Sequence, residues 1–253
     1  MDPVDILRAM KAALGGKGET ALAAVEDRLK DPFAVLIATV LSHRTRDERT
    51  SEAAMRLFER FRTPQELAAA AESEVADLIR GVGFYRNKAR AIIKIAREIT
   101  EKHGGEVPRD LEGLLELPSV GRKTANCVLV YGFGLEAIPV DTHVHRIANR
   151  IGLVATRTPE ETEGELMGIF PKRTWAEVND TFVMFGKKIC KPIGQRCWIC
   201  PLTGFCEYYK AGLGRSEGTK REREEEKRKE KRRAVRKVDN QIPKSDGKDK
   251  RGK

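Results

Sequence analysis

The apolar residues of this chain recur at helical spacing, and no segment shows the sustained two-residue alternation that marks a half-buried strand. The stretch PFAVLIATVLSH (32–43) is apolar on every side, which predicts a buried central helix. Further helices are expected in the segments 47–61, 63–79, 87–103, 110–117, 123–133, 141–153, 158–170 and 175–190. Thr63 and Glu66 predict a capping box at the start of the second of these segments. These patterns together predict an all-α fold.

Basic residues are concentrated at the C-terminal end. The chain has 253 residues, enough for one large or two small domains, and its net charge is +10. Residues 215–253 hold 17 lysines and arginines against 9 acidic residues, whereas 1–214 hold 31 against 29. The segment 214–253 is therefore interpreted as a charged tail, disordered or a solitary exposed helix. It would add salt-dependent affinity for a polyanion, or serve only to increase solubility.

Neither a targeting segment nor a membrane span is predicted. The start MDPVDILRAM lacks the basic and apolar regions of a signal peptide, and the longest apolar run (33–41) has about half the length of a span. We expect a soluble intracellular protein with no membrane partner. Its place would be the cytoplasm, near the nucleoid, in a prokaryote or the nucleus in a eukaryote.

Four of the five cysteines lie within 17 residues. Cys190, Cys197, Cys200 and Cys206 are separated by six, two and five residues. Four thiolates on one looped segment can hold zinc or an iron–sulfur cluster, and the spacing alone leaves both open, with disulfides a third reading. Cys127 lies in an apolar helix and is interpreted as a core residue.

The stretch LPSVGRKTAN (117–126) has the form of a tight hairpin that leads into a helix. Backbone N–H groups of the hairpin and of the helix start can bind an anion such as a DNA phosphate. An ordinary connection between two helices is the alternative. Lys123 would lie in the first turn, where the helix dipole and burial favour the neutral amine, a nucleophile suited to Schiff-base chemistry.

Asp141 precedes another helix, in the stretch VDTHVHRIANR (140–150). Aspartate is a favoured N-cap, so a purely structural role is possible. A carboxylate near Lys123 could instead take a proton from the ammonium or stabilise positive charge on a sugar ring.

Four stretches, in this order, resemble the endonuclease III family of helix-hairpin-helix DNA glycosylases: 81–89, 106–126, 140–150 and the cysteine array. The likeness covers roughly residues 25–210. It implies a two-lobed all-α fold, with a six-helix barrel domain over 26–135 and a second domain formed by 1–25 and 136–213. It also implies a 4Fe–4S cluster on Cys190, Cys197, Cys200 and Cys206.

The resemblance implies a bifunctional DNA glycosylase and lyase of base excision repair. Such an enzyme excises oxidised or ring-saturated pyrimidines from double-stranded DNA, acts at abasic sites, and works as a monomer. Lys123 would form the Schiff base before β-elimination nicks the strand, and Asp141 would assist. A glycosylase for thymine or uracil opposite guanine, and a DNA-binding scaffold without catalysis, are the alternatives.

The resemblance also implies DNA contacts. Arg44 aligns with a residue that fills the gap left by an everted base, and Phe84 aligns with an intercalating wedge. The other expected DNA contacts are Leu117, Ser119, Gly121, Arg122 and His143. Ser119 replaces the usual glycine, which carries a cost if the position needs positive φ. His43 and Arg44 replace a stretch that usually contains glutamine, which puts base preference in question.

Overall fold

The computed structural model describes residues 2–15 and 31–214, which belong to one compact unit. The regular elements of the described residues are helices, with one isolated bridge between Arg80 and Val82. The all-α prediction is therefore confirmed. None of the described helices is long and apolar enough to cross a membrane. The predicted tail, 214–253, lies outside the described residues except for Gly214.

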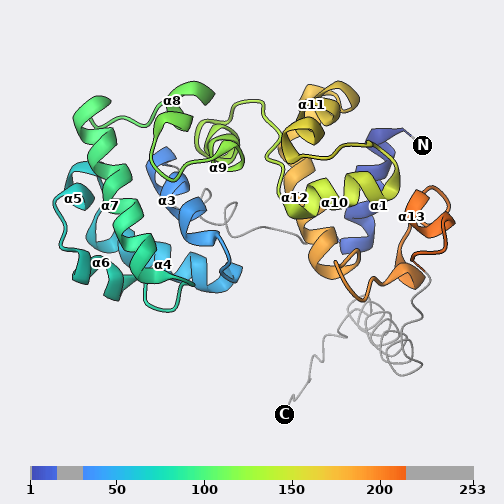
Figure 1. Cartoon of the computed structure of the whole chain (residues 1–253), viewed down its shortest axis with the longest axis horizontal. Helices are drawn as coiled ribbons and strands as arrows, with labels where there is room; N and C mark the ends of the chain where they lie inside the picture. Colours follow the sequence, from blue (N-terminus) through green and yellow to red (C-terminus); the bar gives the residue numbers. More distant parts are fainter. Residues whose placement is uncertain (1, 16–30, 215–253) are drawn as a thin grey trace, which may run out of the picture. The chain divides into compact units, whose positions relative to one another are not determined.

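One hydrophobic core is built around α3 (Pro32–Ser42), which packs against α4, α7, α9 and η1 (Figure 1). Every residue of α3 from Phe33 to Leu41 is buried, as its apolar sequence predicts. The other helices of this core are α4 (Asp47–Arg60), α5 (Pro64–Ala68), α6 (Glu72–Leu78), α7 (Tyr85–Lys102), α8 (Leu111–Glu116), α9 (Arg122–Cys127) and the π-helical turn η1 (Val128–Gly132).

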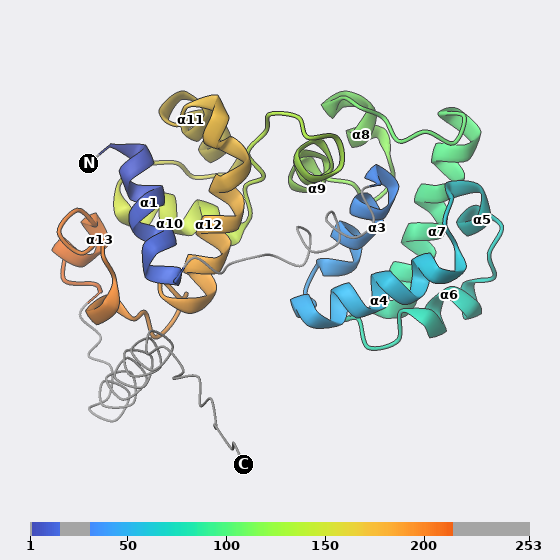
Figure 2. The same ribbon diagram turned by 180° about the vertical axis from the view of Figure 1, so that it is seen from behind.

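A second core joins the first helix to the C-terminal part of the described chain. Helix α1 (Pro3–Leu14) packs against α12 (Trp175–Lys188), which also packs against α10 (Thr142–Ile151) (Figure 2). The remaining elements of this group are α11 (Pro159–Ile169), η2 (Lys172–Thr174), η3 (Cys197–Ile199) and α13 (Glu207–Lys210).

The two cores divide the chain close to the predicted domain boundary. The first core ends with Ala137 and the second resumes at Ile138, two residues beyond the predicted end at 135. Residues 16–30, which contain the other predicted boundary, lie outside the described residues. The domain limits 26–135, with 1–25 and 136–213, stay a prediction.

The helix predicted over 63–79 is wrong in one respect, because it is two helices. Thr63 forms the predicted capping box with Glu66 at the start of α5, but the chain turns at Ala71, where ψ is 135°, before α6 begins. The alanine run offers no sequence signal for this break. The turn lets both α5 and α6 pack against α7, with Leu67 and Val75 fully buried.

Candidate active site

The helix-hairpin-helix unit consists of α8, the connection 117–121 and α9. The connection closes with a hydrogen bond from Val120 N to Leu117 O at 3.2 Å. Ser119 has φ 63°, so the position does require the conformation for which glycine is favoured. Ser119 and Gly121 are exposed, whereas the Leu117 side chain is buried in the core. Leu117, predicted as a DNA contact, could therefore contact DNA only through its backbone.

Lys123 lies in the first turn of α9, as predicted, and is half-buried. It lines a cavity of about 310 Å³, a size at the lower end of small-molecule sites. The other lining residues come from four places: His43 follows α3, Gly121, Arg122 and Thr124 form the start of α9, Val140 precedes α10, and Pro159, Glu160 and Glu163 belong to α11. The lysine therefore borders a space into which a small group can enter.

Asp141 caps the start of α10. Its Oδ1 accepts hydrogen bonds from His143 N at 2.8 Å and Val144 N at 2.9 Å. A carboxylate has further lone pairs on its second oxygen, so capping leaves it able to accept another proton donor. Asp141 immediately follows Val140, which lines the cavity.

The charges of both Lys123 and Asp141 affect the pKa of Cys127. Complete burial raises the pKa of its thiol, the nearby charge and hydrogen bond of Lys123 oppose this, and the carboxylates of Asp141 and Asp180 add to it. Cys127 lies one turn further along α9 than Lys123. The charges of Lys123 and Asp141 therefore both act on the pKa of the same buried thiol. The predicted core position of Cys127 is confirmed.

His43 is a cavity residue that the sequence did not assign to the site. Its Nε2 lies 3.3 Å from Thr124 Oγ1. Burial lowers the pKa of His43 to about 4, and the positive charges of Lys123 and Lys88 act in the same direction. The ring is therefore neutral at pH 7, with one nitrogen as donor and the other as acceptor.

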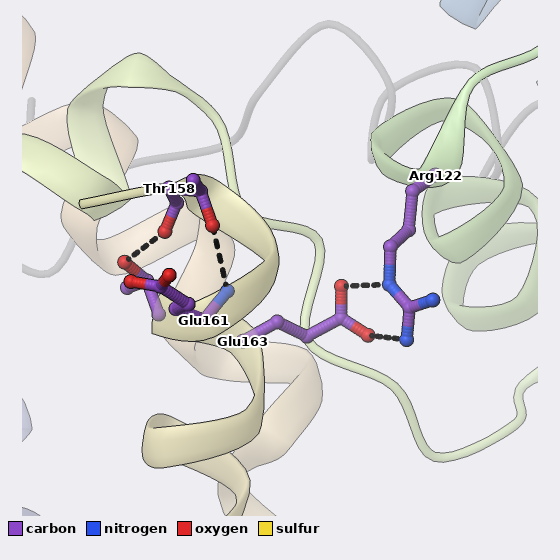
Figure 3. Close-up of polar contacts among 5 residues, drawn as sticks. Arg122, Thr158, Glu161 and Glu163 are labelled. Carbon is purple, nitrogen blue, oxygen red and sulfur yellow. Dashed lines mark hydrogen bonds and ion pairs between the residues drawn. The ribbon is translucent and has the colours of Figure 1, made fainter. Parts of the chain in front are cut away.

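Arg122 and Glu163 form a bidentate ion pair between α9 and α11 (Figure 3). Arg122 Nε lies 2.9 Å from Oε2, and Nη2 lies 3.0 Å from Oε1. The Glu163 side chain is only 4% exposed, so its charge depends on this partner. Thr158 caps the start of α11 by accepting from Glu161 N. The pair ties the helix that carries Lys123 to a helix of the second core.

We predict that Glu163→Gln lowers the free energy of unfolding by about 1 to 2 kcal/mol, because the buried amide can accept only one of the two hydrogen bonds from Arg122 and turns a donor toward the other. Urea unfolding would measure the change. Glu165→Gln makes the same substitution at an exposed position of α11 and should cost less than about 0.5 kcal/mol. Equal effects of the two variants would show that the ion pair contributes nothing of its own.

Arg44 and Phe84, which are predicted to enter the duplex as a gap-filling residue and a wedge, lie next to each other. The Arg44 guanidinium carbon is 6.0 Å from the centre of the Phe84 ring, and Phe84 is 62% exposed. Their φ angles are 53° and 57°. With Ser119 they are the three non-glycine residues of the described chain that have positive φ. Such strain persists where surrounding structure enforces it, and it often marks functional loops.

His143, the last predicted DNA contact, is half-buried beside Asp141. Its Nδ1 lies 3.1 Å from Arg146 Nη2, and its ring packs so closely on Gly186 that no side chain could replace that glycine's hydrogen. The Arg146 Nη2 atom also donates to Cys190 O at 2.9 Å. A chain of hydrogen bonds thus runs from Asp141 through His143 and Arg146 to the backbone of Cys190.

The four cysteines of the array line one cavity. Burial raises the pKa of Cys200 to about 12, and the neighbouring sulfurs act in the same direction. Backbone N–H groups point at Cys200 and Cys206, and Arg150 Nη1 lies 3.7 Å from the Cys190 sulfur. Among the described residues, no three side chains converge on a point that suits a single metal ion. The donor set nevertheless fits a thiolate-bound centre, since four sulfurs with N–H donors share one cavity.

The sequence analysis did not assign three residues near the site, although the sequence offered a clue for two of them. Lys88 lies on the apolar stripe of the amphipathic helix α7, four residues before Ile92, and Glu163 lies in α11, three residues before the buried Leu166; both are buried. A charge on an apolar stripe indicates a buried partner. His43 was noted only as a departure from the family pattern, and nothing in the sequence indicated its contact with Thr124, 81 residues away.

Comparisons with known proteins agree with this geometry. Residues 37–172 match the HhH-GPD superfamily base excision DNA repair protein family. Endonuclease III of Thermotoga maritima is 54% identical over 195 residues, which cover 77% of this chain and 90% of that protein. The chain belongs to the endonuclease III family. The predicted family and its helix-hairpin-helix glycosylase fold are therefore confirmed, and the chain is a bifunctional DNA glycosylase and lyase of base excision repair.

Two solved structures of this family are also similar. A trapped covalent endonuclease III–DNA intermediate is 42% identical with a TM-score of 0.68, and the match covers 72% of this chain and 86% of that one. A non-covalent endonuclease III–DNA complex is 38% identical with a TM-score of 0.73, and the coverage is 82% and 94%. The similarity extends over most of the described residues.

Proposed function

We propose that the chain excises oxidised or ring-saturated pyrimidines from duplex DNA, with Lys123 as the nucleophile. The observation that carries the proposal is the position of Lys123, at the start of α9, directly after the hairpin and at the edge of the cavity. One of the similar solved structures is a trapped covalent intermediate between an endonuclease III and DNA. Lys123 supplies the amine that such a bond requires.

The reaction begins when the lysine nitrogen bonds to the anomeric carbon of an everted nucleotide. The bond from that carbon to the base breaks, and the base leaves with the electron pair and takes a proton. Opening of the sugar ring gives a protonated imine, which acidifies the neighbouring C2′ proton. Loss of that proton expels the 3′ phosphate, and water then releases the sugar fragment from Lys123.

Asp141 supports this sequence through its charge. Its carboxylate can take the ammonium proton of Lys123 before attack, or stabilise positive charge on the sugar as the base departs. The exposed backbone of the hairpin at Ser119 and Gly121 supplies N–H groups for a phosphate next to the lesion. Arg44 and Phe84 would enter the duplex, as a gap-filling residue and a wedge.

The four cysteines would hold a 4Fe–4S cluster. Cys190 lies beyond α12, Cys197 begins η3, Cys200 follows η3 and Cys206 precedes α13, so the four cysteines belong to a segment with little regular secondary structure. The cluster would supply a covalent cross-link there. Arg150 reinforces the same loop, because it donates to Lys191 O at 2.7 Å and Pro192 O at 3.0 Å.

We predict that the purified protein is brown, contains about four iron atoms for each chain, and absorbs at about 400 nm. Cys200→Ser should lower both the iron content and the absorbance, because it removes one thiolate ligand. Cys127→Ala removes the cysteine outside the array and should change neither. A colourless protein with one zinc ion for each chain would contradict the assignment.

A panel of duplexes tests the substrate class. Duplexes with an oxidised or ring-saturated pyrimidine should be nicked faster than duplexes with thymine or uracil opposite guanine, under single-turnover conditions. Preference for the mismatched bases would favour the first alternative function. Binding without any base release or nicking would favour the scaffold.

A further inference from the structure

Two loops that are far apart in the sequence meet at Arg44 and Phe84. Arg44 follows α3, and Phe84 immediately precedes α7. Each backbone is held at positive φ, a conformation that costs on the order of 1 kcal/mol or more for a residue with a side chain. A contact must therefore keep these loops from relaxing.

Lys88 supplies that contact from the first turns of α7. Its residue is only 8% exposed, and its Nζ donates to Leu41 O at 2.7 Å, His43 O at 2.5 Å and Thr45 Oγ1 at 3.0 Å. The carbonyls of Leu41 and His43 lie at the C-terminal end of α3, which carries partial negative charge and lacks helical donors. The bonds to His43 and Thr45 hold the two residues that flank Arg44 in the chain.

The network continues into the second loop. Thr45 Oγ1 accepts a hydrogen bond from Gly83 N at 3.2 Å, in addition to the one from Lys88. The two backbones touch, since a side chain at Gly83 would place its first carbon 2.8 Å from Arg44 O. One buried ammonium thus holds the loop of Arg44 against the loop of Phe84.

A buried lysine loses hydration free energy that an apolar side chain in the same core position would not lose. Burial lowers the pKa of Lys88 to about 8, so the ammonium predominates at pH 7 despite its loss of hydration. The neighbouring positions on this stripe of α7 are filled by Ala89, Ile92 and Ile95. An apolar side chain at position 88 would continue the stripe without that cost, but it would leave the carbonyls of the loop unpaired.

We propose that Lys88 is a positioning residue that holds Arg44 and Phe84 in the paired arrangement needed to enter the duplex. Eversion of the base then depends on Lys88, whereas the chemistry at Lys123 does not. The inference rests on the proposed roles of Arg44 and Phe84 in DNA.

Lys88→Met tests this proposal, because it keeps most of the side-chain length and removes the ammonium. Lys94→Met is the matched control, since Lys94 is an exposed lysine of the same helix. Single-turnover nicking would be compared on a duplex and on a single strand, each with a preformed abasic site. A single strand requires no eversion. Lys88→Met should lower the rate on the duplex at least about tenfold and the single-strand rate less than about twofold.

A second readout follows eversion directly. The fluorescence of 2-aminopurine beside the abasic site should rise with the unmodified protein and with Lys94→Met, and rise much less with Lys88→Met. Thr45→Val and Gly83→Ala break the same network without removing Lys88, so both should reproduce the duplex-specific loss. Thermal unfolding of each variant, measured alongside, would check that the variant is folded at the temperature of the assay.

Equal losses on the duplex and the single strand would overturn the proposal, because they would indicate a general structural role. An unchanged rate on both substrates with an unchanged fluorescence rise would also overturn it. Failure of the unmodified protein to nick either substrate would instead refute the proposed lyase role of Lys123. The fluorescence change requires no chemistry and would still decide the role of Lys88.

Discussion

Lys123→Ala should lower strand nicking at least about ten-thousand-fold, because it removes the atom that bonds to the sugar. Binding of a lesion duplex should change less than about threefold. The contacts proposed for binding come from other groups, namely the hairpin backbone, Arg44 and Phe84. Single-turnover nicking assays and fluorescence anisotropy would measure the two quantities on the same duplex.

Lys94→Ala is the control for this experiment. It removes the same charge and side-chain length from an exposed position on α7 and should leave nicking within about twofold. Nicking that persists in Lys123→Ala would exclude the proposed nucleophile. A parallel loss of binding and nicking would instead point to a lysine that grips phosphate.

Asp141→Asn should reduce nicking by about a hundredfold to a thousandfold. Asparagine is as good an N-cap as aspartate, so the bonds from His143 N and Val144 N can persist while the negative charge disappears. The loss would then report the role of the charge toward Lys123 and the sugar. The melting temperature should fall by only a few degrees.

Asp110→Asn is the matched control for the capping role. Asp110 caps α8 by accepting from Gly113 N at 2.8 Å and does not line the cavity. The same substitution there should have a similar small effect on stability and leave the nicking rate unchanged. If Asp141→Asn behaves in the same way, Asp141 is a helix cap and nothing more.

Local sequence signals predicted much of this molecule. Helical spacing predicted α3 and its complete burial, and the threonine and glutamate of TPQE predicted the capping box of α5. Glycine and lysine in the stretch 117–126 predicted the hairpin and the position of Lys123. These features depend on residues a few positions apart, which is why the sequence alone reveals them.

The rest depends on contacts between distant segments. Lys88 bonds to groups 43 to 47 residues away, and Arg122 pairs with Glu163 across 41 residues. Periodicity can mark such charges as anomalous, but it cannot name the partner. The same reason explains why the surroundings of Asp141 emerge only from the fold.

Borohydride trapping is the most direct test of the central claim. Reduction of the imine during the reaction should yield one stable adduct of protein and lesion-strand DNA, and mass spectrometry of its peptides should place the sugar remnant on Lys123. Nicked DNA without a trapped adduct, or a remnant on any other residue, would contradict the account.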